Sequence, residues 1–185
     1  MRHISEYKGN LLNHLQAFYA HGDHDLAVEL MEAFGLTVVD VPITEEFSLV
    51  RVHPNADDRD NVDNVVFLAE APPAYAQLDA VLQARRTTDP EFKAALDNYL
   101  EFARNDVSPH FGVRFPTAEA LEQAIDKLKN HLSPALGQRV SVSEPPSYGP
   151  VADFPDIRQV FVRTDVFALG PTTFGQTIEL QVERA

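Results

Sequence analysis

Apolar and polar positions change their period several times along the chain, and each change marks the limit of a short element. Residues 11–20 alternate with a period of two, which predicts a strand with His14 and Gln16 on one face. Residues 25–35 instead carry apolar side chains at helical spacing, and Gly35 ends the predicted helix in its usual C-terminal role. Further strands are predicted at residues 36–41, 47–53 and 65–69. The first part of the chain therefore has the order βαβββ.

The same order returns in the last part of the chain. A strand is predicted at residues 110–115, and Thr117 then caps a helix that has Glu119 in its first turn. Three strands follow, at residues 140–143, at 159–165 and around Glu179. A repeated element order indicates an internal duplication, although the two parts are not similar residue by residue.

A helical hairpin is predicted between these two parts, with Asp89 as an N-cap and Pro90 at the start of its second helix. The sequence thus predicts an α+β fold. It consists of two βαβββ modules, residues 1–70 and 109–185, joined by a helical linker at residues 71–108.

Composition narrows the functional classes. The chain has 185 residues, with 44% hydrophobic and 23% charged residues, which is typical of a soluble globular protein. No apolar run is long enough to span a bilayer and the first residues lack the apolar core of a signal peptide, so we expect a cytoplasmic protein with no membrane partner. The net charge of −13 argues against nucleic acid as a partner. There are no cysteines, so any metal site must use His, Asp, Glu or water.

Candidate chemistry centres on Glu179, a single acidic residue in the last predicted strand. Thr177, Glu179 and Gln181 alternate with apolar residues, so the carboxylate lies on a polar strand face. It points either into water or into a cavity where it binds something. A histidine stands in the first strand of each module, His14 in one and His110 in the other. Both are candidates to meet Glu179.

These residues are carried by segments that resemble a known family. The segments are His14 with FYAHGDHDLAVELMEAFGL after it, His110 with FGVRFPTAEALEQAI, and the terminal FGQTIELQ. They resemble the vicinal oxygen chelate superfamily, which includes glyoxalase I, bleomycin-resistance proteins, fosfomycin-resistance enzymes and extradiol dioxygenases. The resemblance implies that the modules form a curved, partly open β-barrel around a central cavity. It also implies that metal ligands come from the first and last strand of each module.

Carried over position by position, the resemblance implies three protein ligands, His14, His110 and Glu179. Phe67 stands where a fourth ligand, a glutamate, would be expected, and Glu70 should face the opposite side of its strand. Two imidazoles and one carboxylate suit Fe(II) or Mn(II), with Zn and Ni also acceptable, and leave positions open for a small-molecule substrate with vicinal oxygens. A lyase, a transferase and a dioxygenase are all compatible with this site.

Other residues are candidates for substrate binding. By parity Arg114 shares a strand face with His110, Gln16 with His14, and His53 with Arg51. Phe67 is a further candidate for substrate binding, because it stands at the position where the resemblance would place a fourth metal ligand. Extradiol cleavage would also need a histidine within residues 91–108 and a tyrosine shortly before Glu179, and both are missing from the sequence.

Two alternatives remain open from the sequence. The histidines can instead belong to a metal-free protein that sequesters a small molecule, as bleomycin-resistance proteins do. The site can lie within one chain, or between two chains of a homodimer. The remaining histidines are expected at the surface: His3, His21, His24 and His131.

Overall fold

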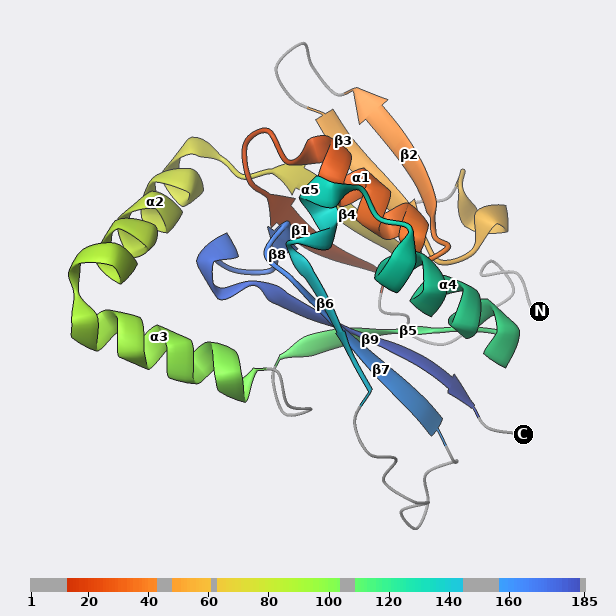
Figure 1. Ribbon diagram of the computed structural model, residues 1–185. Coiled ribbons are helices and arrows are strands. Elements are labelled where there is room, and N and C mark those ends of the chain that lie inside the picture. Colours follow the sequence, from red (N-terminus) through yellow and green to blue (C-terminus); the bar gives the residue numbers. More distant parts are fainter. Residues whose placement is uncertain (1–12, 43–47, 61–62, 104–108, 145–156, 184–185) are drawn as a thin grey trace.

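The strands of the protein form two mixed sheets, accompanied by helices, in a computed structural model (Figure 1). The structure describes residues 13–42, 48–60, 63–103, 109–144 and 157–183. The fold is therefore α+β, as predicted.

The first sheet has the strand order β2-β3-β4-β1-β8. Its elements are β1 (His14–Tyr19), β2 (Thr37–Pro42), β3 (Ser48–His53), β4 (Val65–Glu70) and β8 (Phe167–Ala168). β1 and β4 run parallel, and helix α1 (His24–Ala33) follows β1. A short helical turn, η2 (Ala56–Asp58), lies between β3 and β4. The two-residue strand β8 was not predicted, and it comes from the last part of the chain.

The second sheet has the order β5-β9-β7-β6. Its strands are β5 (His110–Arg114), β6 (Val140–Ser143), β7 (Ile157–Thr164) and β9 (Gln176–Glu183). Helices α4 (Ala118–Asn130) and α5 (Pro134–Gly137) connect β5 to β6, and η3 (Thr172–Phe174) precedes β9. The Thr117 side chain accepts a hydrogen bond from the backbone N–H of Ala120, as the predicted N-cap requires.

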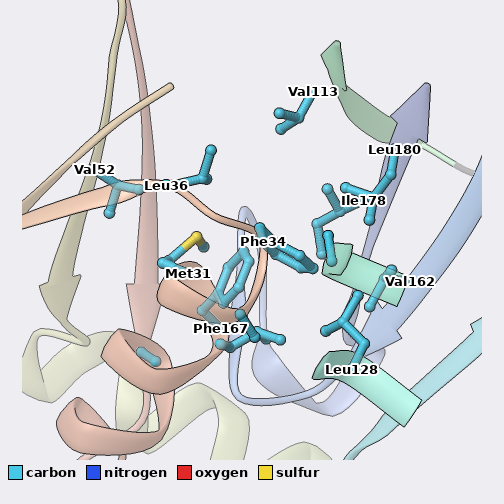
Figure 2. Packing of buried hydrophobic residues seen from close by; sticks show 14 of the residues in the cluster. Met31, Phe34, Leu36, Val52, Val113, Leu128, Val162, Phe167, Ile178 and Leu180 are labelled. Carbon is cyan, nitrogen blue, oxygen red and sulfur yellow. The ribbon is translucent and has the colours of Figure 1, made fainter. Parts of the chain in front are cut away.

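The two sheets are not closed into a barrel. Buried apolar side chains of both sheets, of α1 and of α4 instead form one core. Figure 2 shows Phe34 next to Phe167, with Met31 on the α1 side and Ile178 and Val162 on the strands of the second sheet. The helices therefore fill the space between the apolar faces of the sheets, and the polar faces point away from this core.

β8 ties the last part of the chain to the first sheet. Phe167 pairs with Tyr19 and is fully buried, and Ala168 pairs with Phe18. Because β8 covers only these two positions of β1, the N-terminal half of β1 has no partner strand on that side within the described residues.

The helical linker forms a hairpin of α2 (Pro73–Thr88) and α3 (Pro90–Phe102), on the opposite side of the molecule from α1 and α4 (Figure 1). The Asp89 carboxylate accepts hydrogen bonds from the backbone N–H groups of Glu91 and Phe92, which confirms the predicted cap. Asp79 attaches the hairpin to η3 by accepting hydrogen bonds from Thr172 and Thr173. Among the helices in the described part of the chain, none combines the length and apolar character needed to cross a bilayer.

Gly175 gives a direct test of the turn that leads into β9. Its φ is +67°, and a Cβ atom there would lie 2.7 Å from the backbone oxygen of Thr164. We expect Gly175→Ala to lower the free energy of unfolding by at least about 2 kcal/mol, since left-handed strain and a backbone clash add. Gly137→Ala is the matched control, because a Cβ atom at Gly137 meets nothing within 4 Å. Denaturant unfolding checks both, and equal stability of the two variants would contradict this account.

Candidate functional site

The polar face of the second sheet carries two of the three predicted ligands. Ile178 and Leu180 of β9 are fully buried in the core, so the residue between them, Glu179, points from the opposite face. The register places Glu179 next to Gly112 of β5 on one side and Phe161 of β7 on the other. The predicted alternation in this strand is therefore confirmed.

His110 and Glu179 contact each other directly. The distance from His110 Nε2 to Glu179 Oε2 is 3.1 Å, and the other carboxylate oxygen accepts a hydrogen bond from the Gln159 side chain. Glu179 is only 7% exposed, whereas the His110 side chain is 28% exposed. The His110 ring also packs edge-on against Phe161, with 5.5 Å between ring centroids. The carboxylate is thus buried and held at both oxygens, with an imidazole at its open side.

Gly112 lies directly beside this pair and leaves room for the side chains that surround the carboxylate. A Cβ atom at Gly112 would lie 3.0 Å from Gln181 Nε2 and 3.7 Å from Glu179 Oε2. A larger residue would therefore crowd the side chains around the carboxylate.

The third predicted ligand, His14, lies on the other sheet. Its Nδ1 atom is 2.6 Å from Asn13 Oδ1, and its ring packs on Phe67 with 5.3 Å between centroids. Gln16 pairs with Phe67, which in turn pairs with Arg51, so all of these candidate substrate-binding residues share the His14 face. His53 is two residues beyond Arg51 on the same strand and therefore shares this face as well.

A cavity of about 330 Å³ separates the N-terminal half of β1 from β5. His14 lines it from the first sheet, and Gly112 and Arg114 line it from the second. The cavity therefore lies between His14 and the strand adjacent to Glu179. Within the described ranges, however, no group of three or more His, Asp or Glu side chains is placed to hold a metal ion. The structure brings His110 and Glu179 together and leaves His14 outside their contact.

His21 and His24, which lie outside the predicted triad, form ion pairs near the start of α1. His21 is exposed and lies 2.6 Å from Glu70, which raises its pKa. His24 is one-third exposed and contacts Asp25 and Asp40, and both hydrogen bonds raise its pKa. The Asp23 side chain, at the start of α1, makes no capping hydrogen bond and instead accepts one from Arg139 at 2.8 Å.

Sequence reasoning missed one feature of the first sheet. Among the described residues, buried side-chain atoms without a hydrogen-bond partner belong to His53, Arg51 and Tyr75. Burial and the neighbouring Arg51 charge lower the pKa of His53, and the carboxylates of Asp58 and Asp60 oppose this shift. Burial raises the pKa of Tyr75. No sequence pattern marks a side chain as unpartnered, so this feature emerges only from the packing.

Comparisons with known proteins give matches only to solved structures, and at low similarity. No family model matches the sequence, and no curated protein matches it. A solved structure from Bacillus anthracis, provisionally assigned to the glyoxalase family, aligns over 100% of both chains with 13% identity and a TM-score of 0.44. The chain is similar over its whole length to a structure placed in that family. A hypothetical protein from S. aureus aligns over 94% of this chain and 95% of its own, with 15% identity and a TM-score of 0.45.

At such identities and TM-scores these likenesses assign no reaction. The functional argument therefore depends on the side chains of this chain.

The lowered pKa of His53 predicts a specific pH dependence of stability. Because the folded state disfavours the imidazolium, the unfolded chain binds the proton more readily, and this residue's contribution is lost as the pH falls below about 6.5. His21 and His24 act in the opposite direction, since their raised pKa values add stability at low pH. We expect His53→Leu to reduce the loss of stability between pH 7.5 and 5.5 relative to the unsubstituted protein. Parallel urea titrations check this, and identical pH slopes would contradict it.

Proposed function

We propose that the protein is a divalent-metal-dependent enzyme of the vicinal oxygen chelate type, acting on a small substrate with vicinal oxygens. The observation that carries this proposal is the contact of a partly exposed imidazole, His110, with a buried carboxylate, Glu179. A buried carboxylate is costly to keep charged unless it is paired, and binding a metal ion is one of the usual reasons to retain one.

His110 and Glu179 would hold the metal from one sheet, and His14 is the proposed third ligand. This residue lines the cavity that Gly112 also lines, which supports its assignment. A metal held by two imidazoles and one carboxylate would supply Lewis-acid chemistry to two substrate oxygens, and Fe(II) or Mn(II) suits the donor set best. His14 can approach the pair by a shift of the β1–β5 edges within one chain, or it can be donated by a second chain in a dimer.

The protein's own side chains have separable roles in this proposal. Gln159 fixes the orientation of Glu179 through a hydrogen bond to the oxygen that does not contact His110. Arg114 lines the cavity and is suited to an anionic part of the substrate. The two halves would act as βαβββ modules that flank one concave site.

Metal uptake tests the proposal. We expect close to one equivalent of Fe or Mn per chain after anaerobic reconstitution, and at least about a 100-fold loss of affinity in His110→Ala and Glu179→Gln. His131→Ala is the matched control, because His131 is an exposed histidine that pairs with Asp126 and is not one of the proposed ligands. Equal uptake in all four proteins, measured by elemental analysis after desalting, would refute the ligand assignment.

Gln159 gives a graded version of this test. Gln159→Leu removes the hydrogen bond that orients the carboxylate while all three proposed ligands remain, so we expect metal affinity to fall about 10- to 100-fold. Competition with a fluorescent chelator measures the change. An unchanged affinity would mean that Glu179 does not depend on this contact, or does not bind the metal.

A metal-free binding protein is the second candidate function. The cavity between β1 and β5 favours it, because most of its lining is apolar: Leu15, Leu36, Pro54, Val65, Val66, Phe111 and Val113. This alternative predicts thermal stabilisation by an apolar ligand in the presence of a chelator, and tolerance of Glu179→Gln. Loss of ligand binding in Glu179→Gln would argue for the metal enzyme instead.

A further inference from the structure

We propose that Arg51 and His53 form a binding site for an oxyanion, the carboxylate or phosphate group of a small molecule, on the polar face of the first sheet. The site lies on β3 and uses neither His110 nor Glu179. It therefore goes beyond the proposed metal centre and stands whether or not a metal is bound.

His53 is fully buried, yet neither of its ring nitrogens has a hydrogen-bond partner. The buried Nε atom of Arg51 also has none. Native proteins rarely leave such groups unpaired, because each loses its hydration without gaining a replacement bond. Two adjacent unpaired groups therefore indicate that something other than the protein chain completes them.

These groups are gathered on one face of the sheet. Arg51 and His53 are two positions apart on β3, and the pairing of Arg51 with Phe67 and of Phe67 with Gln16 brings an amide to the same face. Tyr75, whose buried hydroxyl also has no partner, packs its ring on Phe18 at 5.3 Å from the α2 side. Phe18 shares the face of Gln16 by alternation. Arg51 and His53 thus share one sheet face, whereas Tyr75 lies farther along it, at the level of Leu49 and four residues from His53.

The chemistry of these groups selects an anionic acceptor. The guanidinium of Arg51 is positively charged and offers only donors. A neutral imidazole supplies one further donor. A cation is disfavoured there because Arg51 already imposes a positive potential on His53, and the nearby Asp58 and Asp60 compensate it only in part. A carboxylate or phosphate group accepts several hydrogen bonds and neutralises the charge.

The test uses the full chain treated with EDTA, so that its result does not depend on the metal proposal. Inorganic phosphate and malonate are titrated at pH 7.5 and constant ionic strength, with sodium chloride as the reference. We expect saturable binding by calorimetry, a rise in Tm, and shifts of the His53 ring ¹⁵N signals. Arg51→Gln and His53→Leu should each weaken binding by about 10- to 100-fold. Arg59→Gln, a change of an exposed arginine in the turn after η2, should leave it unchanged.

His53→Leu has a second expected property that separates binding from folding. Because replacing an unpartnered buried polar group by an apolar one removes a cost, its Tm without anion should equal or exceed that of the unsubstituted protein. The same variant should lose the rise in Tm with phosphate. Phosphate and malonate effects no larger than those of chloride would overturn the proposal. It would also be overturned by effects that persist in both Arg51→Gln and His53→Leu.

Discussion

The structure depends above all on the burial of alternate side chains of β9 between two sheets. Ile178 and Leu180 are fully buried in a core that α1, α4 and both sheets share. A shift of one residue in β9 would exchange the two faces and move Glu179 into that core, where a carboxylate would lose its partners. The hydrophobic core therefore fixes the side of the sheet on which the carboxylate lies. Its meeting with His110 follows from the register of β5 on β9.

The shared core also determines where a ligand can enter. The polar faces of the two sheets point away from this core, and a cavity lies between β1 of the first sheet and β5 of the second. β8 covers only Phe18 and Tyr19, so the N-terminal half of β1, including His14, borders the cavity. Packing and site geometry are thus two consequences of the same arrangement. His14 therefore lies on the part of β1 that has no partner strand on this side within the described residues, and this part borders the cavity.

Local patterns in the sequence were sufficient for most elements and for the faces of individual strands. Alternation around Glu179 identified its polar face, and Asp89 with Pro90 located the break in the hairpin, because both depend on neighbouring residues alone. Contacts between distant segments could not be obtained in this way. The two-residue strand β8 carries no periodic signal, and the capture of Asp23 by Arg139 depends on tertiary approach. Whether the sheets close into a barrel depends on how the helices pack between them, and no strand pattern records that.

The central claim is that His14, His110 and Glu179 bind one metal ion, although they come from two sheets. X-ray absorption spectroscopy of the Mn(II)-loaded protein tests this most directly, because imidazole rings give a characteristic outer-shell scattering. The account predicts two imidazoles per metal in the unsubstituted protein, and one imidazole in both His14→Ala and His110→Ala. The same number of imidazoles in His14→Ala as in the unsubstituted protein would show that His14 is not a ligand and would contradict the account.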